Sequence, residues 1–193
     1  DKIKERSQYA EAGAPVLQRA ARLSRGDLGA RSQIFGTTPD YLKTTKYGVA
    51  EGRFFTKGED RSGARVALLG HDVAENLFPN QDPIGKYFKI DGIRFKALGV
   101  MEKQGKFLGL FSFDTQVIIP SGTSQRLFSK RGFLRISVKV PEDKISESKD
   151  EIYGIMRQIR GLKPKEKDDF AVNQTEAFES TYNRIKFAIG GVG

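Results

Sequence analysis

The chain has 193 residues, one histidine and no cysteine. This length suits one ordinary domain or two small ones that bury a hydrophobic core without metal or disulfide links. The balance of 38% hydrophobic and 30% charged residues is typical of a soluble globular protein. The missing cysteine excludes thiol nucleophiles, thiolate metal sites, iron–sulfur clusters and disulfides.

The net charge is +9, from 33 Lys and Arg against 24 Asp and Glu. Such a charge suits nucleic acid, anionic lipid or an acidic protein. The basic residues are scattered, with no run of five and no nucleic-acid-binding motif, which favours a solvated surface. No nucleic acid is expected as a partner, although the 14 Phe keep a basic single-strand nucleic-acid binder open as an alternative.

The first third of the chain predicts two strands and a short helix. Residues 14–23 could be helix by composition or strand by their Pro-led start, and we predict a strand. Residues 32–36 predict a second, short strand. Thr38-Pro39-Asp40 then supplies a helix N-cap, a proline at the first helical position and an early acid, so a short helix is expected through Leu42.

The middle of the chain predicts a strand–helix unit and a hairpin. Residues 65–70 form an apolar strand, and Asp72 and Glu75 have the spacing of a capping box for a following helix. Residues 86–97 alternate around Asp91-Gly92, which predicts a two-residue type I′ turn. One face of this hairpin is expected to be apolar, with Phe88, Ile90, Ile93 and Phe95. The other face is expected to be exposed to water, with Tyr87, Lys89, Arg94 and Lys96.

The last third predicts strands at 117–120 and 134–140, a helix over 144–160 that Gly161 ends, and a strand at 170–172. Alternation of apolar and polar residues in 134–140 predicts a half-buried strand. The fold class is therefore mixed α+β.

Residues 102–113 are an unusual loop, because apolar side chains lie between two glycines. Packing of this loop under the sheet is the favoured interpretation, and an apolar tip that faces a partner or a membrane is the alternative. The candidate partner-facing or membrane-facing residues are Phe107, Leu108, Leu110 and Phe111.

The sequence does not predict a catalytic site. His71 is the only histidine, and Asp72 beside it is better used as a helix cap than as the orienting acid of a triad. No carboxylates are clustered at metal-ligand spacing, so no metal is expected. The glycines form neither a P-loop nor a dinucleotide fingerprint, so no cofactor is expected, and ATP would bind another chain or domain.

The C-terminal residues 187–193 are uncharged and rich in small residues. They are interpreted as the start of a truncated transmembrane helix, and a Gly-rich tail is the alternative.

Several short motifs occur in the order and approximate spacing seen in one known family. They are Gly52-Arg53-Phe54-Phe55, Val66 to Gly70, Leu77-Phe78, Asp82-Pro83-Ile84-Gly85-Lys86, Phe95 with Gly99-Val100, Asp114, and Val117-Ile118-Ile119-Pro120. From about Ile34 to Val172 the chain resembles the periplasmic core domain of MacB-like ABC transporter permeases, within the superfamily that also contains lipoprotein-releasing and cell-division permeases. Structural rather than chemical roles are expected for Gly52, Arg53, Phe54, Gly70, Asp82, Pro83, Gly85, Lys86 and Pro120.

The resemblance implies a two-lobed extracytoplasmic domain: a porter-like α+β lobe from residues 1–60 and 133–186, and an inserted β-rich lobe from residues 61–132. It implies a non-catalytic domain that couples ATP-driven membrane motion to export or efflux. The implied partners are an ABC ATPase subunit or domain, a second permease copy and a periplasmic adaptor. The implied location is the cytoplasmic membrane of a bacterium or archaeon, with the domain facing the periplasm or cell exterior. A lipoprotein-releasing or cell-division permease is the related alternative.

Overall fold

The computed structural model describes residues 2–45, 48–107, 111–128 and 132–173. The described chain forms two compact units, one within residues 10–139 and one from residues 2–9 and 140–173. These bounds differ from those of the expected lobes, whose division at residues 60 and 132 stays a prediction. None of the helices in the described ranges has the length and apolarity that crossing a bilayer requires.

The first unit contains ten strands and several short helices within the described residues. In chain order they are β1 (Ala12–Arg25), β2 (Leu28–Thr37), the 3-10 helix η1 (Pro39–Lys43), β3 (Val49–Gly52), α2 (Lys57–Ser62), β4 (Val66–Leu69), α3 (His71–Leu77), β5 (Tyr87–Ile90), β6 (Ile93–Met101), β7 (Lys106–Phe107), β8 (Phe111–Ser112), η2 (Phe113–Thr115), β9 (Gln116–Pro120), α4 (Ser121–Phe128) and β10 (Phe133–Lys139). The second unit contains α1 (Lys2–Arg6), η3 (Glu142–Lys144) and α5 (Ile145–Arg160).

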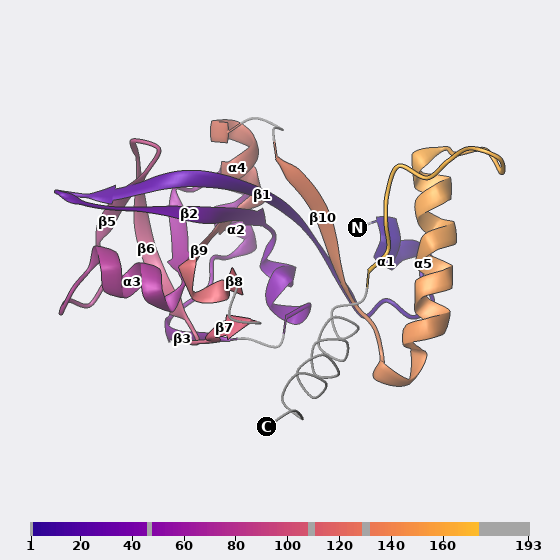
Figure 1. Cartoon of the computed structure of the whole chain (residues 1–193), viewed down its shortest axis with the longest axis horizontal. Coiled ribbons are helices and arrows are strands. Elements are labelled where there is room, and N and C mark those ends of the chain that lie inside the picture. Colours follow the sequence, from indigo (N-terminus) through magenta and orange to yellow (C-terminus); the bar gives the residue numbers. More distant parts are fainter. Residues whose placement is uncertain (1, 46–47, 108–110, 129–131, 174–193) are drawn as a thin grey trace, which may run out of the picture. The chain divides into compact units, whose positions relative to one another are not determined.

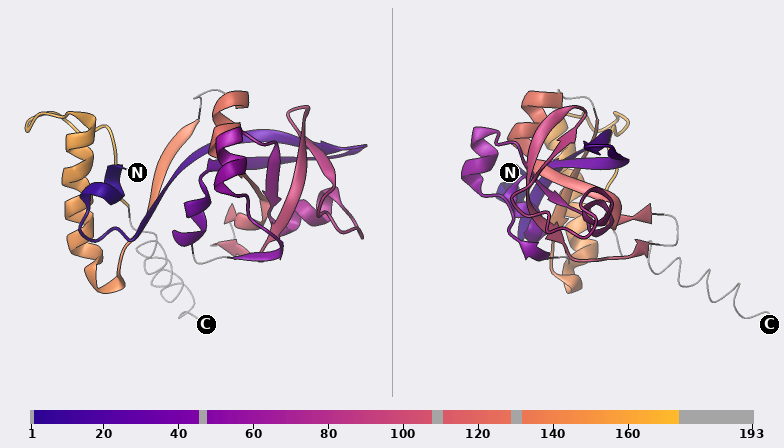
Figure 2. Two further views of the ribbon diagram at one scale, coloured as in Figure 1. Left: turned by 180° about the vertical axis from the view of Figure 1, so that it is seen from behind. Right: turned by 90° about the vertical axis from the view of Figure 1, so that its left-hand side faces the viewer.

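Within the described residues, six strands pair into a closed ring in the order β1, β2, β9, β4, β6, β5 and back to β1. β10 extends the sheet beside β1, and β3 extends it beside β6. The long antiparallel pair β1–β2 runs along one side of this unit (Figure 1), and Figure 2 shows the same pair from behind. The β2–β9 and β4–β6 pairs are parallel and the other pairs of the ring are antiparallel, so the ring is mixed.

The ring closes where β1 meets the β5–β6 hairpin. Only Leu23 and Ser24 of β1 pair with β5. Asp91, in the hairpin turn, supports this short contact: its N–H donates to the Arg22 carbonyl (2.8 Å), and its carboxylate accepts from the Arg22 N–H (2.9 Å) and from Arg19 Nη2 (2.8 Å). The turn residue that reverses the hairpin therefore also ties the hairpin to β1.

The core lies on both faces of the central strands, because every residue of β4 and of β9 is buried. Residues that alternate along these strands belong to two apolar clusters: Leu69 and Ile119 lie in one, and Leu68 and Ile118 in the other. The first cluster also takes the buried face of α3 and the apolar face of the β5–β6 hairpin. Burial of apolar side chains on both faces stabilises this unit.

Most of the predicted elements are confirmed. The ambiguous segment 14–23 is a strand within β1, 32–36 lies in β2, and 65–70 contains β4. The Asp-Gly turn has positive φ at both residues, 47° at Asp91 and 83° at Gly92, as a type I′ turn requires. The predicted apolar and wet faces of the hairpin are confirmed by burial.

The predicted helix caps need correction. α3 begins at His71 with Gly70 as its N-cap, so Asp72 lies inside the first turn and is not a capping residue. Thr38 is the N-cap of η1, but its side chain makes no capping hydrogen bond. The capping box is at Thr56 and Glu59 instead: Thr56 Oγ1 accepts from the Glu59 N–H, and the Glu59 carboxylate accepts from the Thr56 N–H.

β10 is a strand as predicted, but over residues 134–137 its burial is the reverse of the prediction, whereas Val138 is half-buried and Lys139 is exposed as expected. Leu134 and Ile136 are 62% and 40% exposed. Arg135 is half-buried, and its guanidinium lies 5.1 Å from the centre of the Phe35 ring. The alternation therefore predicted the right strand but the wrong side over residues 134–137, because Arg135 packs on an aromatic ring of the core.

In the second unit, α5 is confirmed and Gly161 ends it in the left-handed conformation. α1 packs against α5, and Glu151 accepts hydrogen bonds from the Ser7 hydroxyl and from the Gln8 N–H. The predicted strand at 170–172 is wrong, since no described strand includes these residues. The segment just before them is held to α5 by side chains, with Asp168 accepting from Arg157.

β3 reaches β6 at a point where two glycines meet. Gly52 has a positive φ of 76°, and a Cβ there would lie 2.2 Å from the Leu98 carbonyl oxygen. A Cβ on Gly99 would lie 2.8 Å from the Glu51 carbonyl oxygen. Since both neighbours are backbone atoms, neither position accepts a larger residue without movement of a strand.

Gly52→Ala is expected to destabilise the first unit by about 3 kcal/mol, because the methyl group meets a backbone carbonyl and the residue keeps a positive φ. Gly58→Ala is the control: it lies in α2, and a Cβ there meets nothing closer than 3.7 Å. Urea unfolding of both variants measures the difference. Equal stability of the two variants would contradict the close approach of β3 and β6.

Candidate functional site

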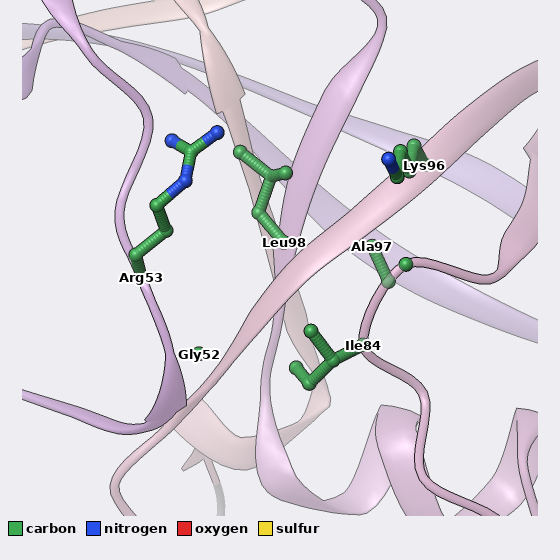
Figure 3. Close-up of a pocket in the computed structure, with 7 residues that line it drawn as sticks. Gly52, Arg53, Ile84, Lys96, Ala97 and Leu98 are labelled. Carbon is green, nitrogen blue, oxygen red and sulfur yellow. The ribbon is translucent and has the colours of Figure 1, made fainter.

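Several of the motif residues border one shallow depression of about 420 Å³. Figure 3 shows its lining side chains, which come from the end of β3, the turn before β5 and the middle of β6. The lining residues are Gly52, Arg53, Ile84, Gly85, Lys96, Ala97 and Leu98. Four of these seven residues belong to two of the sequence motifs, Gly52-Arg53-Phe54-Phe55 and Asp82-Pro83-Ile84-Gly85-Lys86.

The Asp82–Lys86 segment makes mainly backbone contacts. The Asp82 carboxylate accepts from the Ile84 N–H (2.8 Å), and the Lys86 N–H donates to the Pro83 carbonyl (3.0 Å). Gly85 has a φ of 79°, and its N–H donates to the Ala97 carbonyl of β6 (2.8 Å). This is a closed turn that places the start of β5 against β6.

Arg53 makes a bidentate ion pair with Glu59, with both Nη–Oε distances at 2.8 Å, and also donates to the Phe54 carbonyl. The Arg53 guanidinium lowers the pKa of Glu59 to about 2, and the Thr56 N–H adds to this effect. Because Glu59 also caps α2, one carboxylate ties the end of β3 to the start of that helix.

The other motif residues lie at strand ends. A Cβ on Gly70 would lie 2.3 Å from the Asp114 carbonyl oxygen, so β4 and the segment before β9 approach closely there. Asp114 is buried, and its carboxylate accepts from the N–H groups of Gln104 and Gly105. Pro120 is buried at the end of β9.

In the motif Gly52-Arg53-Phe54-Phe55, the rings of Phe54 and Phe55 lie 4.3 Å apart, and Phe55 is buried. In the apolar loop, Phe107 and Phe111 pair as residues of β7 and β8, and Leu108 and Leu110 lie outside the described residues. Residues 187–193 also lie outside them.

His71, Asp72 and Glu75 correct the expectation that no ligands are clustered. His71 Nδ1 lies 3.7 Å from an Asp72 oxygen and 3.6 Å from a Glu75 oxygen, and one donor atom from each residue falls within 4.8 Å of the others. The three residues lie on one seven-residue surface helix, and Glu75 is exposed. Such groups are common without an ion, so we give this cluster no part in the function.

The sequence interpretation missed the Thr56–Glu59 capping box and the Arg53–Glu59 pair. The signal was present, because Thr-Lys-Gly-Glu has the capping-box spacing. The depression is lined mainly by backbone segments and by Arg53, which is already paired with Glu59. Its geometry therefore supports a contact between structural elements better than a reaction centre.

Comparison with known sequences gives one family over most of the chain. Residues 1–153 match the family described as MacB-like periplasmic core domain. The match begins at residue 1, so it extends further toward the N-terminus than the resemblance from Ile34. The chain is 32% identical to the macrolide export ATP-binding/permease protein MacB of Rhodospirillum rubrum, over 84% of this chain and 25% of that protein. It is 27% identical to the pyoverdine export ATP-binding/permease protein PvdT of Pseudomonas aeruginosa, over 86% of this chain and 26% of that protein. The chain thus spans about a quarter of the length of these relatives.

Two solved structures show the same fold. The periplasmic region of MacB from Actinobacillus actinomycetemcomitans has a TM-score of 0.74 at 17% identity, over 93% of this chain and 79% of that one. The extracellular domain of the transporter YknZ from Gram-positive bacteria has a TM-score of 0.70 at 20% identity, over 84% and 83%. The mixed α+β fold is therefore confirmed, and the chain belongs to the family of MacB-like periplasmic core domains.

Proposed function

We propose that this chain is the extracytoplasmic domain of an ABC transporter permease, and that it couples ATP-driven membrane motion to export or efflux of a substrate. The observation that carries the proposal is the family match over residues 1–153. The domain has a mechanical role and catalyses no reaction. It faces the periplasm or the cell exterior from a protein anchored in the cytoplasmic membrane.

The construction of the first unit supports a mechanical role. A closed ring of strands, buried on both faces at β4 and β9, resists bending more than an open sheet does. A stiff body that is moved by flanking segments changes a binding surface without chemistry of its own. The motif residues serve this stiffness, with Gly52 and Gly70 allowing close approach of the backbone and Arg53 joining β3 to α2.

The partners follow from the same proposal. The relatives are named as ATP-binding/permease proteins, which supports an ATPase domain or subunit as the source of motion. A second permease copy and a periplasmic adaptor complete the proposed assembly. The loop with Phe107, Leu108, Leu110 and Phe111 is the proposed partner-facing or membrane-facing segment.

The Arg53–Glu59 pair predicts a pH dependence. The pKa of Glu59 is about 2 in the folded chain, below its usual 4.5, so its contribution to stability is complete above about pH 4.5 and is lost as the pH falls toward 2. With Arg53 half-exposed, this contribution is about 1 kcal/mol.

Urea unfolding at pH 7 and pH 3 measures the effect. Glu59→Gln is expected to lose stability at pH 7 and to show a smaller fall between the two pH values than the parent chain. Glu51→Gln, which removes an exposed carboxylate of β3, is the matched control. An unchanged pH profile in Glu59→Gln would contradict the assignment.

The coupling role is tested in the full-length permease that carries this domain, reconstituted with its ATPase in vesicles. Gly52→Ala is expected to reduce substrate export about tenfold while ATP hydrolysis continues, since the variant loosens the coupling body and leaves the ATPase intact. Gly58→Ala is expected to export normally, with equal amounts of both proteins in the membrane. Normal export by Gly52→Ala, despite a destabilised domain, would refute the coupling role.

A further inference from the structure

Five cationic side chains that are scattered in the sequence share one face of the sheet. This cationic face consists of Arg22 of β1, Arg31 of β2, Lys89 of β5, and Arg94 and Lys96 of β6, and all five residues are exposed. On β5 and β6 this face is the side opposite the core residues Phe88 and Phe95. On β1 it is the side opposite the buried Leu23. The ends of β1 and β2 lie beside the β5–β6 hairpin in Figure 1.

The strand register places like charges directly opposite each other twice. Arg22 pairs with Arg31 across β1 and β2, and Lys89 pairs with Arg94 across β5 and β6. Residues opposite each other on antiparallel strands have Cβ atoms about 5 Å apart, and like charges at such positions destabilise the pair. Both pairs therefore act against folding.

Within the described part of the chain, none of the five cations of this face forms an ion pair with an acid. The two turns that border the face carry Asp91 and Asp27. Asp91 already accepts from Arg19 and from the Arg22 N–H, so its charge is engaged in closing the ring. The positive charge of the face is left for solvent or for a ligand.

The centre of the face is preorganised for binding. The Arg94 guanidinium lies over the Tyr87 ring, 3.7 Å from its centre, which fixes the guanidinium and leaves its N–H edge open. Tyr87 is 47% exposed. Ser24 pairs with Lys89 in register and adds a hydroxyl group. Ser24, Tyr87, Lys89 and Arg94 also border a depression of about 240 Å³.

We propose that the cationic face docks an acidic segment of a partner protein, with carboxylates between the opposed cations. Arg and Tyr are the residue types that protein interfaces favour, and a stacked guanidinium holds a carboxylate with two parallel hydrogen bonds. A nucleic acid is a less suitable ligand, because Arg94 already covers the Tyr87 ring on which a base would stack. Apart from Tyr87, the neighbours on this face, Ala20, Ser24 and Gln33, offer a lipid bilayer no large apolar side chain. This inference does not depend on the proposed transport function.

Binding of poly-L-glutamate to the 193-residue chain tests the proposal by titration at about 50 and 150 mM salt. The double variant Lys89→Gln/Arg94→Gln is expected to raise the dissociation constant about tenfold. The control Lys149→Gln/Lys165→Gln removes the same charge from exposed positions of the second unit and is expected to change it less than twofold. Equal weakening in both double variants would overturn the proposal, because the binding would then depend on net charge alone.

Three further measurements separate this face from its alternatives. Vesicles of phosphatidylglycerol and phosphatidylcholine, or a single-stranded oligonucleotide, would overturn the proposal if either bound the face more tightly than poly-L-glutamate.

Lys89→Glu is expected to raise the melting temperature by about 1–2 °C, by relieving the repulsion with Arg94, while it weakens poly-L-glutamate binding. A lower melting temperature would show that the opposed cations serve stability, which contradicts a docking face.

Discussion

Closure of the strand ring at Asp91 is the contact on which the first unit depends. β1 pairs with β5 at only two residues, Leu23 and Ser24, and this short ladder alone separates a closed ring from an open sheet. Asp91 supports the ladder with three hydrogen bonds, to the Arg22 N–H and carbonyl and to the Arg19 guanidinium. The Asp at this turn has two roles: it adopts the positive φ of a type I′ turn, and it supplies the carboxylate that binds β1.

The closed ring gives the short sequence motifs a common physical meaning. Gly52 and Gly70 lie where backbones approach too closely for a side chain, the Asp82–Lys86 turn sets the start of β5 against β6, and Arg53 joins β3 to α2 through Glu59. Each of these contacts fixes one element relative to the ring. A body built in this way is suited to transmit motion, and the matching periplasmic and extracellular domains share its fold.

Local patterns predicted local structure well, and they failed where tertiary contacts decide. The Asp91-Gly92 turn and its two faces follow from the sequence, since both depend on neighbouring residues. The ring could not be predicted, because β1–β5 pairing joins residues far apart in the chain. The predicted side of β10 was wrong over residues 134–137 because Arg135 packs on Phe35, a contact that alternation does not encode. Part of the cationic face follows from the hairpin, since Lys89, Arg94 and Lys96 were expected together on its wet side. Arg22 and Arg31 could not be added to them, because they join this face only through the β1–β5 and β1–β2 register.

Native-state amide hydrogen exchange of an Asp91→Ala variant tests the closed ring most directly. If Asp91 holds β1 to β5, exchange is expected to speed up about tenfold at the amides of both β5 and the last residues of β1, because the two strands separate together. Asp91→Asn keeps the turn geometry and one acceptor oxygen, and a smaller change is expected there. Faster exchange confined to the turn residues 91 and 92, with β1 as protected as in the parent chain, would contradict closure of the ring at this contact.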